Sequence, residues 1–515
     1  MDRQPAIDLK NITKRFGTKV IANKNVNLTA YRGEILSVLG ENGSGKTTLM
    51  NIISGIYFPD EGQIFIDGKE AVISSPKDAF SYKIGMIHQH FKLVDVFSAA
   101  ENIVLGIENK KYNLKKSVEE IKNIINQYGF NLDPEKKIYE MSVSEKQTVE
   151  IIKVLYRGAD ILILDEPTAV LTPQETEKLF DILRRMRDDG KCIIIITHKL
   201  HEVLSLSDRV SVLRKGEYVG TINTSEADES KLTEMMVGKK IDLNIERFNP
   251  ENLADRLVIK NITCHDRMGT TVLDNVSFTA KGGEILGIAG IAGSGQRELL
   301  ESIAGLQKLS AGEILYYAPD SDKTENLRDK TPMQIRNMGV RLSFVPEDRL
   351  GMGLVGNMDI VDNMMLRSYS KGHSFFLKRK SPKDLAMKII HDLEVVTPGA
   401  STPVRRLSGG NVQKVLVGRE IASSPTVLMV AYPVRGLDIN SSYLIYNLLN
   451  EQKKKGVAVI FVGEDLDVLV ELCDRIMVIG SGRITGVVDA RNTSKEEIGL
   501  LMTKSKFDGK ENSNG

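Results

Sequence analysis

The chain is an imperfect tandem repeat, and this repeat limits the folds that are open to it more than any other feature. The motif Gly-Glu-Ile-Leu at 33–36 recurs 250 positions later at 283–286. The motif Asp-Arg-Val at 208–210 recurs 266 positions later as Asp-Arg-Ile at 474–476. A period this long indicates two duplicated domains rather than a solenoid of short repeats.

Each repeat predicts one α/β domain, because 515 residues are too many to bury around a single core. In each half, β-rich stretches precede a strand, a glycine-rich loop, a helix and a helical stretch. Apolar strands then alternate with helices. This order predicts a mostly parallel sheet core with a β-rich subdomain and a helical subdomain. The predicted boundaries are domain 1 at 1–240, a linker at 241–256, domain 2 at 257–503 and a polar tail at 504–515.

Charge and hydropathy disfavour several classes of protein. The 69 Lys+Arg and 68 Asp+Glu residues nearly cancel, so no nucleic-acid partner is expected. Cys192, Cys264 and Cys473 lie far apart and fit small buried side chains in a reducing compartment. No apolar run approaches the roughly 18 residues that cross a bilayer, and the first residues have no long apolar stretch, so no signal peptide is expected. Contact with a membrane is therefore expected only through a partner protein.

A glycine-rich loop in the first half predicts a nucleotide site. Residues 40–47 match the pattern G-x-x-x-x-G-K-[ST] and lie between an apolar strand at 35–39 and a helix-like stretch at 48–53. Glycines let backbone N–H groups curve around phosphate oxygens, and a helix N-terminus adds a positive dipole end. Lys46 is expected to reach the β- and γ-phosphates of ATP, and the Thr47 hydroxyl to bind Mg²⁺. The predicted ATP contacts in this loop are Gly40, Asn42, Gly43, Ser44, Gly45, Lys46, Thr47 and Thr48.

Polar residues that follow buried strands complete the predicted catalytic set. The apolar run 161–164 leads into Asp165, expected to hold Mg²⁺, and Glu166, expected to polarise the attacking water. His198 follows another apolar strand and is a candidate for γ-phosphate contact, and Gln89 is a candidate for catalysis and for Mg²⁺. A structural histidine, a surface glutamine and an ordinary strand end remain the alternatives for these positions.

The order of these elements resembles the ATP-binding subunits of ABC transporters over essentially the whole chain. A Leu-Ser-Gly-Gly signature stands in the second half at 407–410. The resemblance implies two tandem P-loop NTPase domains that pack head to tail, with each ATP between one domain's phosphate loop and the other's signature. It also implies that Phe16 stacks on adenine and that Asp438 reaches the partner domain's loop. The signature residues then expected to contact ATP are Ser408, Gly409 and Gly410.

The two halves have lost complementary motifs. In the second half, Gln296 replaces the loop lysine, Arg297 replaces the threonine, and Ala-Tyr at 431–432 replaces the two carboxylates. In the first half, the signature reads Met-Ser-Val-Ser-Glu at 141–145, without either glycine. In a head-to-tail pair, all intact parts belong to one ATP site. The sequence therefore predicts one hydrolysing site that needs both domains.

A tandem pair with a degenerate second half is similar to the importers for nucleosides and monosaccharides. The resemblance implies an ATPase on the cytoplasmic face of a bacterial cell membrane, with two membrane permease subunits and an extracytoplasmic substrate-binding protein as partners. The stretches 156–160 and 168–175 are closer to the nucleoside branch. They do not touch the transported molecule, so a ribose- or galactose-type importer stays open. A soluble ABC ATPase that acts on ribosomes or DNA is a more distant alternative, disfavoured by the single intact site and the short linker.

Overall fold

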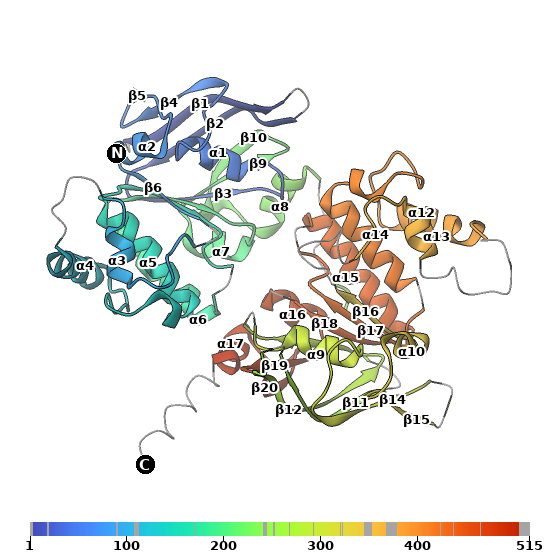
Figure 1. Cartoon of the computed structure of the whole chain (residues 1–515). Coiled ribbons are helices and arrows are strands. Elements are labelled where there is room, and N and C mark those ends of the chain that lie inside the picture. The colour runs from blue at the N-terminus through green and yellow to red at the C-terminus, as the bar shows by residue number, and fades with distance from the viewer. Residues whose placement is uncertain are drawn as a thin grey trace, which may run out of the picture. The chain divides into compact units, whose positions relative to one another are not determined.

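The chain divides into two compact units, Met1–Asp242 and Leu243–Gly515, called unit 1 and unit 2 below (Figure 1). The structure is a computed structural model. It describes residues 4–503 except 18–19, 89–90, 108–112, 170, 240–244, 251–252, 267, 292, 320, 322, 345–352, 367–377, 423, 436 and 464. Each unit has its own hydrophobic core, as the sequence repeat predicts.

Unit 1 contains two sheets. A four-stranded antiparallel sheet has the order β2-β1-β4-β5, and a larger sheet has the order β10-β9-β3-β8-β7-β6, in which only β10 is antiparallel to its neighbour. Every residue of β3 and β8 is buried, as expected for strands covered by helices on both faces. The strands are β1 Pro5–Phe16, β2 Val20–Tyr31, β3 Glu34–Leu39, β4 Glu61–Ile66, β5 Lys69–Ala71, β6 Ile84–Ile87, β7 Ile161–Asp165, β8 Cys192–Ile196, β9 Arg209–Arg214 and β10 Glu217–Asn223.

The helices of unit 1 form a cover for the large sheet and a separate helical subdomain. Helices α3, α4 and α5 lie together on the side of the large sheet away from the antiparallel sheet (Figure 1). Helix α4 buries one stripe, at Ile121, Ile125 and Tyr128, and ends at Gly129 in the left-handed conformation. The helices are α1 Lys46–Ile53, α2 Pro76–Ser81, α3 Ala99–Val104, α4 Leu114–Tyr128, α5 Val143–Tyr156, α6 Pro173–Asp188, α7 Leu200–Leu206 and α8 Glu229–Val237.

Unit 2 repeats this topology. Its antiparallel sheet has the order β12-β11-β14-β15 and its larger sheet the order β20-β19-β13-β18-β17-β16. The strands are β11 Ala254–His265, β12 Thr271–Gly282, β13 Ile285–Ala289, β14 Ala311–Tyr317, β15 Thr324–Asn326, β16 Val340–Phe344, β17 Val427–Ala431, β18 Ala458–Val462, β19 Arg475–Gly480 and β20 Arg483–Asp489. The helices are α9 Gln296–Ile303, α10 Pro332–Asn337, α12 Ile360–Met365, α13 Lys380–Asp392, α14 Gly409–Ile421, α15 Ile439–Lys454, α16 Leu466–Leu472 and α17 Lys495–Thr503.

The repeat extends to residues whose backbone is strained. Asn11 has φ of 54° and its counterpart Asn261 has 51°, both in the left-handed region that residues other than glycine rarely adopt. Glu166 has φ of 47° and its counterpart Tyr432 has 53°. The predicted α/β class, with a parallel core, a β-rich subdomain and a helical subdomain in each half, is confirmed.

Part of the segment predicted as a linker packs on unit 2. The Arg247 guanidinium donates hydrogen bonds to the carbonyl oxygens of Val470 and Cys473 at 2.8 and 2.6 Å. The ammonium of Lys453 donates to the Phe248 carbonyl and pairs with Asp474 at 2.7 Å, with its side chain only 2% exposed. A buried ammonium needs such partners, so this segment stabilises unit 2. Among the described helices, none combines the length and hydropathy needed to cross a bilayer.

Candidate nucleotide site

The phosphate loop connects β3 to α1 in a conformation that requires glycine. Gly43 and Gly45 have φ of 81° and 96°, in the left-handed region. A Cβ on Gly40 would lie 2.3 Å from the Leu213 carbonyl oxygen, and one on Gly45 would lie 2.3 Å from the Ala22 carbonyl oxygen. At Gly40 and Gly45 the loop therefore lies too close to neighbouring backbone for any larger residue.

The lysine of this loop is buried against it. The Lys46 ammonium donates hydrogen bonds to the carbonyl oxygens of Gly40 and Glu41 at 2.6 and 3.0 Å. Burial lowers the pKa of Lys46, and the negative charges of Glu166 and Asp165 oppose that shift. The two carboxylates thus lie close enough to act on the ammonium. Of the other predicted loop contacts, Asn42, Gly43 and Thr47 are exposed, Gly45 and Thr48 are half-buried, and Gly40 and Ser44 are buried.

The two carboxylates lie at the end of β7 in different environments: Asp165 is the last residue of the strand, and Glu166 follows it. Burial, together with the charge of Glu166, raises the pKa of Asp165 to about 6. The hydrogen bond with His198 lowers the pKa of Glu166. Both groups are therefore ionised at neutral pH, which suits Asp165 to a cation and Glu166 to accepting a proton.

His198 joins the carboxylates because β7 and β8 are parallel neighbours. Asp165 is paired with Ile196 in the sheet, so residues that follow both strands meet at one edge. The distance from His198 Nδ1 to Glu166 Oε1 is 2.9 Å, and the His198 side chain is 54% exposed. The structure therefore brings His198 to Glu166 on the surface rather than into the core. Gln89, the other predicted catalytic residue, lies outside the described residues.

The donor set fits Mg²⁺. Among the described residues, no group of three or more His, Cys, Asp or Glu side chains could hold a metal ion without other ligands. A magnesium ion on a nucleotide usually takes one or two protein oxygens and completes its shell with phosphates and water. The Asp165 carboxylate and the exposed Thr47 hydroxyl are oxygen donors of this kind.

The equivalent loop of unit 2 keeps the shape but not the chemistry. Gln296 Nε2 donates to the Ile291 carbonyl at 3.1 Å, as Lys46 does to Glu41. The Arg297 guanidinium, in the place of the Thr47 hydroxyl, pairs with Glu301 at 2.7 Å. Gly295 retains a left-handed φ of 107°. The ammonium of Lys46 and the hydroxyl of Thr47 have no counterpart in unit 2, while the backbone is retained.

The two signature regions differ at the start of their helices. In unit 1, Ser142 and Glu145 form a reciprocal capping box, and Glu145 also pairs with Lys136 at 2.6 Å. In unit 2, the Ser408 hydroxyl caps no backbone N–H of α14 and instead accepts from Asn411 Nδ2 at 2.8 Å. The first turn of α14 carries no acidic residue. Its N-terminus thus favours an anion, whereas Glu145 already occupies that of α5.

Two other predicted contacts have clear positions within their own units. Phe16 ends β1 with 40% of its surface exposed, and its ring meets Tyr57 edge-on at 5.3 Å. Asp438 is the N-cap of α15 and accepts hydrogen bonds from the backbone N–H of Ser441 at 2.8 Å and from its hydroxyl at 2.7 Å. The capping bonds are a sufficient structural reason for an aspartate at position 438. Its contact with the other domain's phosphate loop remains a prediction.

The sequence prediction missed Asn23, which lies beneath the phosphate loop. This fully buried residue of β2 donates from Nδ2 to the Gly45 carbonyl at 3.2 Å. Its counterpart in unit 2 is Leu273. The exchange of a polar for an apolar residue between two otherwise similar strands is the only sequence signal that could have identified it.

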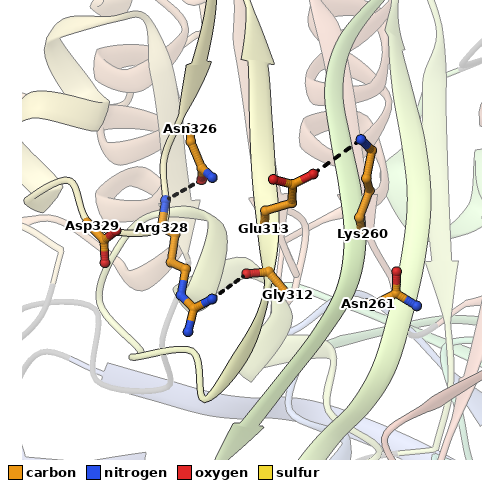
Figure 2. Close-up of a pocket in the computed structure, with 7 residues that line it drawn as sticks. All are labelled: Lys260, Asn261, Gly312, Glu313, Asn326, Arg328 and Asp329. Atoms are coloured by element: carbon orange, nitrogen blue, oxygen red, sulfur yellow. Dashed lines mark hydrogen bonds and ion pairs between the residues drawn. The ribbon is translucent and has the colours of Figure 1, made fainter.

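A pocket of about 690 Å³ lies elsewhere, on the antiparallel sheet of unit 2 (Figure 2). Several of its polar groups are engaged in hydrogen bonds and an ion pair. Lys260 pairs with Glu313 at 3.2 Å, and the Arg328 guanidinium donates to the carbonyls of Gly312 and Ser310. None of the predicted site residues lines it, so it adds nothing to the nucleotide site.

Comparison with known proteins agrees with the fold and the motifs. The sequence matches the ABC transporter family at residues 23–169 and 273–433. The chain is 41% identical to the guanosine import ATP-binding protein of Bacillus subtilis, covering 97% of each chain. It is 39% identical to the nucleoside import ATP-binding protein of Lactococcus lactis subsp. cremoris, covering 98% of this chain and 99% of that protein.

A ribose import ATP-binding protein of Escherichia coli O157:H7 is 36% identical, with 98% of each chain covered. The similarity therefore runs through both units and is not confined to the nucleotide motifs. The family predicted from the sequence is confirmed, and with it the prediction of an ATP-binding ATPase. The chain belongs to the ABC transporter family.

Proposed function

We propose that this protein is the ATP-hydrolysing subunit of an importer. The observation that carries the proposal is the grouping of Lys46, Asp165, Glu166 and His198 at the end of the parallel sheet, beside a loop shaped for phosphate. Lys46 would hold the β- and γ-phosphates. Asp165 and Thr47 would hold Mg²⁺, which neutralises charge on the phosphates. Glu166 would accept a proton from the attacking water, with His198 beside it. Gln89 keeps its predicted catalytic and metal-binding role as part of this proposal.

We infer that the working ATP site combines the loop of unit 1 with the signature of unit 2. The support is electrostatic. The N-terminus of α5 carries Glu145. Helix α14 begins with two glycines, and the hydroxyl of its N-cap residue Ser408 caps no backbone N–H. Phosphate is repelled by the first arrangement and attracted by the second. Phe16 and Asp438 complete the proposed site. The proposed domain boundaries stay as predicted, with domain 1 at 1–240 and domain 2 at 257–503.

Replacing Gly410 by alanine is expected to lower ATP turnover of the assembled transporter at least about tenfold, because a Cβ then stands where backbone must approach phosphate. The fold should tolerate it, since the new Cβ meets only Leu437 Cδ2, at 3.3 Å. The matched control is Ser144→Ala, at the equivalent position of unit 1, which should leave turnover nearly unchanged. A larger loss from Ser144→Ala than from Gly410→Ala would refute the proposed pairing.

We further propose that the transported molecule is a nucleoside. The support is that relatives at 41% and 39% identity are named for guanosine and nucleoside import, against 36% for a ribose importer. The alternative is a monosaccharide such as ribose. The proposed partners are two permease subunits and an extracytoplasmic substrate-binding protein. The protein would lie on the cytoplasmic face of a bacterial cell membrane and touch that membrane only through the permeases.

The substrate assignment predicts which molecule stimulates the transporter. When the chain is reconstituted with its permeases and its binding protein, guanosine or another nucleoside should raise ATP turnover several-fold over the basal rate. Ribose at the same concentration should leave the basal rate unchanged. Turnover is measured as phosphate release, with a Lys46→Ala complex as the blank. Stimulation by ribose alone would reverse the assignment.

A further inference from the structure

The Asn23 side chain has an unpaired polar atom beneath the phosphate loop. Asn23 is 0% exposed, and Nδ2 donates to the Gly45 carbonyl at 3.2 Å, while Oδ1 has no hydrogen-bond partner among the described residues. A buried acceptor without a partner destabilises a folded protein, so an apolar residue of similar size would serve the core better. Its presence therefore needs a reason other than packing.

Unit 2 shows that the loop does not need this amide in order to fold. Leu273 occupies the equivalent position and is also 0% exposed. Above it, Gly295 has φ of 107°, against 96° for Gly45. The hydrogen bond from Ser294 N–H to the Ile291 carbonyl measures 3.0 Å, as does the one from Ser44 N–H to Glu41. The amide is thus present only in the half whose loop carries a lysine.

A second unpaired polar atom lies in the same loop. Ser44 is 3% exposed, and its Oγ has no hydrogen-bond partner among the described residues. Asn23 contacts the residue directly after it. In the described part of the unit 2 loop, no side-chain atom is both buried and unpaired. The unit 1 loop and the strand beneath it therefore contain buried polar atoms without hydrogen-bond partners, whereas the described part of the unit 2 loop contains none.

We propose that Asn23 is a positioning residue for the bound nucleotide. In a trans peptide, the Gly45 carbonyl and the Lys46 N–H point in opposite directions. The Gly45 carbonyl accepts the backbone N–H of Leu49 at 2.9 Å, and the Asn23 Nδ2 bond adds a second donor that holds it on the core side, so the Lys46 N–H faces away from the core. It also polarises the peptide, which makes this N–H a stronger donor to a phosphate oxygen. This role rests on the proposed function of the loop as the phosphate site.

The test compares Asn23→Leu with wild type in the full-length chain, because unit 2 already carries leucine at this position. The Kd for MgATP, measured by calorimetry, should rise about five- to tenfold, which is the effect of one lost hydrogen bond to the loop. The melting temperature without nucleotide should stay the same or rise, because the unpaired acceptor is gone. A purely structural role would instead lower the melting temperature and leave the Kd unchanged.

The matched control is Leu273→Asn, which should lower the melting temperature and leave the Kd for MgATP unchanged. If Asn23→Leu does not fold, Asn23→Ala removes the amide without adding volume and gives the same comparison of the Kd for MgATP. An unaltered Kd in a folded Asn23 variant overturns the proposal. Failure of the underlying function has a different signature, because wild type would then bind MgATP no better than Lys46→Ala does.

Discussion

Replacing Lys46 by alanine is expected to abolish ATP turnover, with a loss of at least about a hundredfold, because no other described cation replaces the ammonium on the loop. Replacing Gln296 by alanine should change turnover by less than about twofold. Both residues begin a helix and bond to the equivalent backbone carbonyl, Lys46 to Glu41 and Gln296 to Ile291. Only Lys46 carries a positive charge and lies within the field of Asp165 and Glu166.

The measurement is phosphate release by the purified, assembled transporter carrying one substitution at a time. Lys46→Gln is the most informative second variant. Gln296 shows that glutamine fits the equivalent loop of unit 2 and keeps the hydrogen bond to the backbone carbonyl. The loss in Lys46→Gln should approach that in Lys46→Ala, which would assign the effect to charge rather than to loop shape. Equal losses from Lys46→Ala and Gln296→Ala would contradict a single hydrolysing site.

The core strands could be predicted from sequence because burial on both faces produces continuous apolar runs. The apolar strand predicted before His198 is observed as Cys192–Ile196, and the predicted strand 35–39 is observed as Glu34–Leu39. The packing of Arg247 and Phe248 on unit 2 could not be predicted in this way. It depends on contacts more than 200 residues apart in the chain, from Arg247 to the carbonyls of Val470 and Cys473 and from the buried Lys453 ammonium to the Phe248 carbonyl.

The grouping of the proposed catalytic residues could be predicted because it depends on strand order alone. Asp165, Glu166 and His198 follow two apolar strands, and parallel neighbours end at the same edge of a sheet. The capping box of Ser142 and Glu145 could also be predicted from nearby residues. Its effect on anion binding becomes clear only by comparison with Ser408, whose side chain caps no backbone N–H of α14. Asn23 was missed because its importance lies in a contact between a strand and a loop 22 residues away.

The degenerate half retains geometry that its own chemistry no longer requires. Tyr432 keeps a left-handed φ of 53°, although a residue with a Cβ adopts this conformation at a cost of about 1 kcal/mol or more. Its N–H donates to the Val462 carbonyl at 2.9 Å, as that of Glu166 does to Ile196. The turn after the strand is thus fixed by the sheet, and the side chain it presents was free to change. A carboxylate at this position is therefore a matter of chemistry rather than of folding.

Because the backbone turn does not depend on the carboxylate, Glu166→Gln is an informative substitution. Turnover should fall about a hundredfold or more, because an amide cannot accept the proton of the attacking water. The Kd for MgATP should stay within about threefold of wild type, since the phosphate contacts of Lys46 and the loop are unchanged. Glutamine has the shape of glutamate, and its carbonyl oxygen can still accept from His198 Nδ1, now 2.9 Å from Glu166 Oε1.

Asp165→Asn provides the contrast, because it should act on the metal rather than on water. That variant should need a higher Mg²⁺ concentration for half-maximal nucleotide binding, whereas Glu166→Gln should not. Binding is measured by calorimetry at several Mg²⁺ concentrations, and turnover by phosphate release. If Glu166→Gln turned over ATP near the wild-type rate, the proton acceptor would have to be another group. If it lost binding and turnover together, Glu166 would act in holding the nucleotide. Only tight binding with stalled turnover fits a residue that contacts the attacking water.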